Sequence, residues 1–115
     1  MKTRKSPRLP ATATVTCRSA HGMLWDVALT DLSEGGCRIE DARGRLRIGE
    51  TVRLFIAGTG PHIASVAWCE GASTGLVFQR ALSARVVSRF AANDWDGAHA
   101  AHEDDLSRAP VRRLI

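Results

Sequence analysis

The sequence predicts an all-β fold, a six-stranded antiparallel β-barrel with one C-terminal α-helix. Three observations predict it: six short segments alternate apolar and polar residues, turn-forming residues separate them, and one helical period follows the last. A chain of 115 residues fits one domain with a single core. Closure into a barrel would remove the unpaired edges of the sheet. We therefore expect a basic N-terminal arm at residues 1–10, a folded unit at 11–92 and a flexible tail at 93–115.

The first two predicted strands span residues 11–17 and 23–29, and both have a period of two. Val15 and Cys17 fall on one face of the first strand, whereas threonines fall on the other. His21 and Gly22 supply a hairpin turn between the two strands. The pair is therefore expected to form a hairpin with one face in the core.

Four further strands are predicted by the same alternation. They span residues 37–39, 52–56, 62–69 and 74–78. A basic loop at residues 41–50 precedes the fourth strand, and glycine and proline at residues 58–61 predict a turn before the fifth. A second turn at Glu70 and Gly71 is expected before the sixth strand.

Beyond Gln79 the apolar period changes from that of a strand to that of a helix. Leu82, Val86, Val87 and Phe90 recur at helical spacing, with arginines on the opposite side. This pattern predicts one amphipathic helix that caps the barrel. Residues 93–115 have no sustained period, which indicates a flexible tail or a short docking segment.

The composition is that of an ordinary globular protein, with 44% hydrophobic and 24% charged residues. No segment approaches the ~20 apolar residues that span a bilayer, so membrane insertion is not expected. Threonines interrupt residues 11–17, where a secretion signal would need a continuous apolar run. We expect a cytoplasmic protein.

The three cysteines are odd in number and widely spaced. Cys17, Cys37 and Cys69 form no CxxC pair, so neither a disulfide framework nor a zinc site is indicated. Each lies in an apolar or alternating run, which predicts reduced thiols in the core. His99 and His102 lie near acidic residues, but we predict no metal site, because nothing in that segment would orient the ligands.

The net charge of +4 is concentrated at the N-terminus, where Arg4 and Arg8 stand four residues apart before the first strand. Pro7 disfavours a helix there, so the pair is expected on a flexible loop. Four extended residues span ~13 Å, so a modest bend would let both guanidiniums grip one dinucleotide-sized ligand. Each can bind phosphate, or guanine through O6 and N7. Such a pair alone is more often a solvated, non-specific patch.

A second motif, residues 31–36, lies between the second and third strands. The Asp31 carboxylate could accept from the N1–H and N2–H groups of a guanine, and the Ser33 hydroxyl could donate to phosphate. Gly35 and Gly36 could take positive φ and let the backbone approach a ligand. The alternative is a turn in which Asp31 and Ser33 bond their own backbone.

The order of these two motifs, with a strand pair between them, resembles the PilZ domain family. The family pattern is RxxxR before the first strand and (D/N)xSxxG after the second, and both are intact at Arg4, Arg8, Asp31, Ser33 and Gly36. The resemblance covers roughly residues 4–90. It extends to residues 66–68 and 75–78, which we expect to be structural.

The resemblance implies a six-stranded split β-barrel that binds cyclic di-GMP, with no other cofactor, no metal and no catalysis. Arg4 and Arg8 would contact guanine and phosphate, Asp31 and Ser33 would hold the guanine edge and the phosphate region, and Gly36 would admit the backbone. Lys5, Gly35 and Arg38 are possible additional contacts. Since the chain has no output domain of its own, we expect binding to reorder the N-terminal arm and to signal to an unidentified effector protein.

Two other functions remain open at this point. One is a PilZ-like interaction scaffold that no longer responds to ligand. The other is a small basic barrel that binds nucleic acid. The sequence argues against nucleic acid because no exposed aromatic stripe is evident. The sequence contains no GxSxG, HExxH or P-loop motif, so we do not expect an enzyme.

Overall fold

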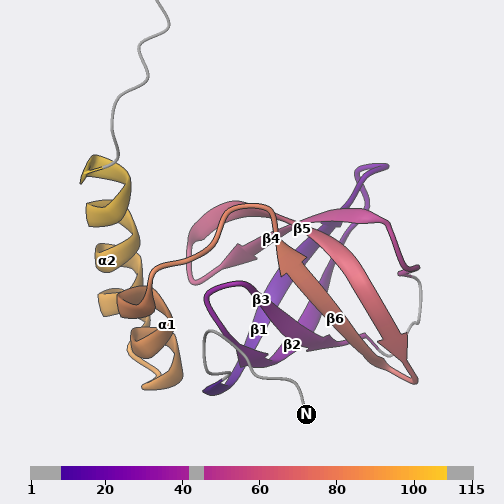
Figure 1. Cartoon of the computed structure of the whole chain (residues 1–115), viewed down its shortest axis with the longest axis horizontal. Helices are drawn as coiled ribbons and strands as arrows, with labels where there is room; N and C mark the ends of the chain where they lie inside the picture. The colour runs from indigo at the N-terminus through magenta and orange to yellow at the C-terminus, as the bar shows by residue number, and fades with distance from the viewer. Residues whose placement is uncertain (1–8, 42–45, 109–115) are drawn as a thin grey trace, which may run out of the picture.

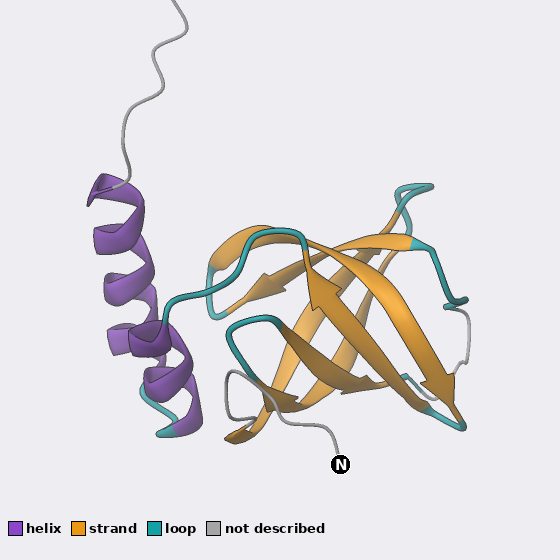
Figure 2. Ribbon diagram, in the orientation of Figure 1, coloured by secondary structure: helices purple, strands orange, loops and turns teal. Residues whose placement is uncertain are grey.

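Six antiparallel strands close into a barrel, and two helices stand on one side of it (Figures 1 and 2). The computed structural model describes residues 9–41 and 46–108. The strands are β1 (Leu9–Ser19), β2 (Leu24–Leu32), β3 (Gly36–Glu40), β4 (Thr51–Ile56), β5 (Thr59–Glu70) and β6 (Ser73–Phe78). Their order around the barrel is β1-β2-β3-β6-β5-β4, and β4 pairs with β1 to close it. The predicted β-barrel is confirmed.

The core lies inside the barrel because each strand turns alternate side chains inward. Along β2, for example, Trp25, Val27 and Leu29 are buried between exposed neighbours. The apolar residues that predicted the helix, Leu82 and Phe90 among them, are buried in the same cluster. The periodicity in the sequence therefore identified the core-facing residues of these elements.

The prediction of a single C-terminal helix was wrong, because a second helix follows the first. Helix α1 spans Ala84–Ala91, and α2 spans Trp95–Arg108. The second helix occupies much of the segment that was expected to be flexible. It buries Ala98 and Ala101, which are too small to produce a strong apolar period in the sequence.

Polar contacts attach α2 to α1. Ser83 caps α1 by accepting from the Val86 N–H, and its hydroxyl donates to the Asp105 carboxylate of α2 at 2.6 Å. Arg85 of α1 forms an ion pair with Asp104 of α2 at 3.2 Å. The helix therefore depends on tertiary partners that lie about 20 residues away in the chain.

Two smaller predictions also needed correction. The turn expected at residues 58–61 is shorter, because it lies at Ala57 and Gly58 and β5 already begins at Thr59. Cys69 is exposed rather than in the core, although Cys17 and Cys37 are fully buried as expected. Burial, together with nearby carboxylates, raises the pKa of the Cys17 thiol to about 12.

Within the described residues, neither helix has the length and apolar content needed to cross a membrane.

Candidate functional site

Asp31 reaches the outer face of the barrel because β2 contains a β-bulge. The pairing of β2 with β3 passes from Leu29 opposite Ile39 to Asp31 opposite Arg38, so Thr30 is an extra residue. Leu29 and Leu32 both remain buried, and the two residues between them, Thr30 and Asp31, are only partly buried. The bulge thus shifts the alternation and keeps the Asp31 side chain partly exposed, at 13% of its surface.

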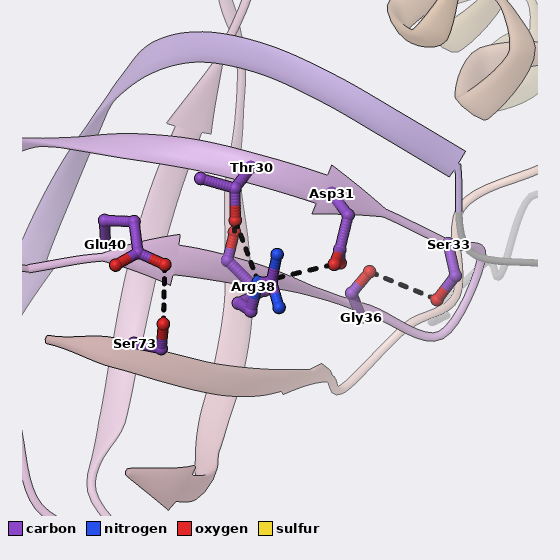
Figure 3. Close-up of polar contacts among 7 residues, drawn as sticks. All are labelled: Thr30, Asp31, Ser33, Gly36, Arg38, Glu40 and Ser73. Atoms are coloured by element: carbon purple, nitrogen blue, oxygen red, sulfur yellow. Dashed lines mark hydrogen bonds and ion pairs between the residues drawn. The ribbon is translucent and has the colours of Figure 1, made fainter. Parts of the chain in front are cut away.

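Arg38 lies directly across from Asp31 and is held by two side chains of β2 (Figure 3). Its Nε lies 3.5 Å from the Asp31 carboxylate and donates to the Thr30 hydroxyl at 3.1 Å. The Thr30 hydroxyl in turn donates to the backbone carbonyl of Arg38. Arg38 therefore stands beside the predicted site, with its side chain 42% exposed.

Thr30 was not singled out from the sequence. Its role depends on the bulge, and a bulge arises from the pairing of two strands rather than from a local residue pattern. Its only local signal is its position beside Asp31, which would not distinguish it from other strand threonines.

Ser33 closes the turn between β2 and β3. Its backbone N–H donates to the Gly36 carbonyl at 2.8 Å, and its hydroxyl donates to the same oxygen at 3.2 Å (Figure 3). Ser33 is buried, with 7% of its surface exposed. In the described structure Ser33 therefore acts as the turn-closing residue that the alternative interpretation of this motif expected.

The two glycines of the loop have different structural roles. A Cβ on Gly36 would lie 2.1 Å from the Leu76 carbonyl oxygen of β6, so only glycine fits where β3 approaches β6. A Cβ on Gly35 would meet nothing within 4 Å. Neither glycine has a positive φ, so the expectation of positive φ here was wrong.

Carbonyl groups of the same loop bind it to the end of β6 and to the segment that follows. The Glu34 carbonyl accepts from the Leu82 N–H, and the Gly35 carbonyl accepts from the Phe78 N–H, both at 2.8 Å. These two hydrogen bonds therefore fix the loop on the side that faces β6 and the start of α1.

The start of β1 lies beside this loop. Leu9 pairs with Leu32 and Pro10 pairs with Asp31, so the first described residues adjoin the end of β2. Arg4, Lys5 and Arg8 themselves lie outside the described residues, as does most of the predicted N-terminal arm. Arg8 is nevertheless bonded to Leu9, and consecutive Cα atoms are only ~3.8 Å apart.

The two other segments on which the family resemblance rests, residues 66–68 and 75–78, make packing contacts. Trp68 packs over Gly75, where a Cβ would lie 2.1 Å from the indole Nε1. Val66 and Leu76 are buried and face each other across β5 and β6. Gly75 is thus required by the close approach of an indole ring.

A family model for the PilZ domain matches residues 2–93. The chain belongs to the PilZ domain family. The matched range includes Arg4, Arg8 and the whole Asp31–Gly36 segment, and it ends before α2. No curated protein matches the sequence significantly.

Solved structures of other PilZ domains have the same fold. The PilZ domain of CeSA from a cellulose-synthesizing bacterium is 16% identical, with a TM-score of 0.55 over 88% of this chain and 99% of that one. The PilZ domain of YcgR from Escherichia coli, solved with c-di-GMP, is 18% identical, with a TM-score of 0.52 over 90% of this chain and 98% of that one.

A third similar structure is larger than this PilZ domain. The inhibitor of motility MotI/DgrA from Bacillus subtilis is 11% identical, with a TM-score of 0.55 over 96% of this chain. The present chain covers 55% of that protein's length. At these sequence identities, the similarity shows a shared fold.

Proposed function

We propose that this PilZ domain is a receptor for cyclic di-GMP. The observation that carries the proposal is the strand register in which Pro10 pairs with Asp31. Because of that register, β1, which directly follows the segment with Arg4 and Arg8, begins beside Asp31. Two guanidiniums and an outward carboxylate can therefore serve a single ligand.

The chemistry of these groups matches the ligand. Cyclic di-GMP carries two negative charges and two guanines, and guanidinium groups bind phosphate or the O6 and N7 atoms of guanine. The partly buried Asp31 carboxylate can accept from the N1–H and N2–H groups of one guanine. Gly35 leaves open space in front of the loop, where a side chain would otherwise stand.

Arg38 is proposed as an orienting residue and a possible phosphate contact. Its Nε is engaged by Asp31 and Thr30, which leaves the exposed end of the guanidinium to face solvent or ligand. Ser33 would contribute chiefly by holding the loop closed, since its hydroxyl already donates to the Gly36 carbonyl.

We further propose that ligand binding folds residues 1–8 against the barrel and changes a surface that an effector protein recognises. No catalytic step is part of this proposal. A ligand can shift such an equilibrium only if it binds one arrangement of the arm more tightly than the other.

Calorimetric titration of the full chain with cyclic di-GMP, beside GTP and a single-stranded oligonucleotide, tests the proposal. We expect saturable binding of cyclic di-GMP alone. Arg4→Ala and Arg8→Ala should each weaken it by roughly ten- to a hundredfold, because each removes a charge-assisted contact. Arg53→Ala removes an exposed arginine from β4 and should leave the affinity unchanged.

Each contrary outcome has a distinct meaning. Absence of cyclic di-GMP binding would overturn the receptor assignment and favour a scaffold. Preference for the oligonucleotide would favour a nucleic-acid-binding barrel. Unchanged affinity in both N-terminal arginine variants would overturn the assigned site while leaving ligand binding itself intact.

A further inference from the structure

A second concave site lies between the barrel and α2, and neither Asp31 nor Ser33 lines it. The cleft has a volume of about 590 Å³ and is bounded by the start of β5, the segment between β6 and α1, and the side of α2 that carries His102 and Leu106. This volume falls within the ~300–1,000 Å³ range of small-molecule sites. The cleft is therefore large enough for a ligand of its own.

His62 lines this cleft and has a defined tautomer. The Thr59 hydroxyl donates its one hydrogen to the Ile56 carbonyl at 2.7 Å. The 2.7 Å contact between Thr59 Oγ1 and His62 Nε2 must therefore be donated by the imidazole. Burial, together with the nearby His102, lowers the pKa of His62 to about 4, so the ring is neutral at pH 7.

It follows that His62 Nδ1 carries a lone pair. No described residue forms a hydrogen bond with Nδ1, and this atom is not fully buried. His62 is 8% exposed and lines the cleft. The lining of the cleft thus includes one hydrogen-bond acceptor on His62.

The rim of the cleft carries a positive charge. Arg80 is exposed there, and no described carboxylate pairs with it. By contrast, the arginines of α1 have acidic partners: Arg85 pairs with Asp104, and Arg89 pairs with Asp94. Arg80 is therefore available to bind an anion.

The remaining lining mixes apolar and polar side chains. Pro61 and Ile63 contribute from β5, Leu82 from the segment before α1 and Leu106 from α2, while Gln79 and His102 are polar. Leu106 is 52% exposed despite its apolar side chain. An occupant would cover this surface and remove it from water.

We propose that this cleft binds a small amphipathic carboxylate that also carries an N–H or O–H donor. The apolar body would contact Ile63 and Leu106, the carboxylate would pair with Arg80, and the donor would reach His62 Nδ1. A carboxylate fits better than a phosphate ester, because its single negative charge matches the one guanidinium among the lining residues, which can hold it by two parallel hydrogen bonds. This site is separate from the one proposed for cyclic di-GMP.

A probe with these three properties is indoleacetate, which has an aromatic body, an N–H donor and a carboxylate. In an NMR titration of the full ¹⁵N-labelled chain, we expect shifts confined to residues 60–63, 79–82 and 98–106. For so small a ligand, a Kd of about 1 mM is expected. Indoleacetamide, which lacks the charge, and naphthylacetate, which lacks the donor, should each bind roughly fivefold more weakly.

Variants assign the two polar contacts. Arg80→Gln should abolish the preference for indoleacetate over indoleacetamide, and His62→Gln should reduce the preference for indoleacetate over naphthylacetate. Arg47→Gln, an exposed arginine elsewhere, is the matched control and should change neither. Absence of binding, shifts outside the cleft, or equal affinity for all three probes would overturn the proposal. Cyclic di-GMP titration of Arg80→Gln reports on the other site independently.

Discussion

At the scale of single residues, the (D/N)xSxxG motif contains residues with separate roles. Asp31 faces outward because of a bulge, Ser33 closes a turn, and Gly36 permits two strands to approach. Of the three, Asp31 is the residue proposed to contact the ligand, and its carboxylate also pairs with Arg38. In this proposal the motif combines one recognition residue with two residues that hold it in place.

The two adjacent glycines permit a matched test of this division. Gly36→Ala should lower the free energy of unfolding by about 2–3 kcal/mol, because its Cβ would lie 2.1 Å from the Leu76 carbonyl oxygen. Gly35→Ala should change it by less than ~1 kcal/mol, since its Cβ meets nothing and φ is not positive. Urea denaturation measures both, and equal losses would contradict the distinction.

At the scale of elements, the strands and α1 were predictable because each buries large apolar side chains at a regular period. Val15 and Cys17 on β1, and Val86 and Phe90 on α1, are all buried as their spacing indicated. A local pattern therefore contained enough information for these elements.

The second helix could not be predicted in the same way. Its buried positions include Ala98 and Ala101, and its attachment to α1 uses Asp104 and Asp105. Alanine and aspartate give little apolar contrast, so the pattern resembled that of a solvated tail. The bulge at Thr30 escaped prediction for a related reason, since it depends on the register between β2 and β3.

The attachment of α2 gives a second stability test. Ser83→Ala removes both the cap of α1 and the donor to the Asp105 carboxylate, so we expect a loss of about 1–2 kcal/mol in the free energy of unfolding. Amide hydrogen exchange should accelerate in α2 as well as in α1. Ser88→Ala, on the exposed side of α1, is the control and should have little effect. Faster exchange in α1 alone would contradict the role of Ser83 in holding α2.

At the scale of the whole molecule, the helices and the barrel share one apolar cluster, which includes Phe90 of α1 and Ala98 of α2. The Glu34 and Gly35 carbonyls bind the loop to the segment around β6 and α1, while His62 of β5 meets His102 of α2 with ring centroids 5.1 Å apart. The proposed ligand loop and the cleft thus both adjoin the Phe78–Leu82 connection. Because His62 is buried at this junction, we expect the free energy of unfolding to depend on pH.

Acidification is expected to lower the free energy of unfolding because of His62. The pKa of His62 in the folded chain is about 4, below the ~6.5 of an unfolded histidine, so acidification protonates the unfolded chain first. The stabilisation is therefore complete above about pH 6.5 and is lost as the pH falls toward 4, by about 3 kcal/mol in all.

Urea denaturation between about pH 7 and 5, where most carboxylates stay ionised, should register the first part of this loss. His62→Gln should flatten the dependence, whereas His21→Gln, in an exposed turn, should preserve it. A wild-type stability that stays constant over this range would contradict a buried, neutral His62.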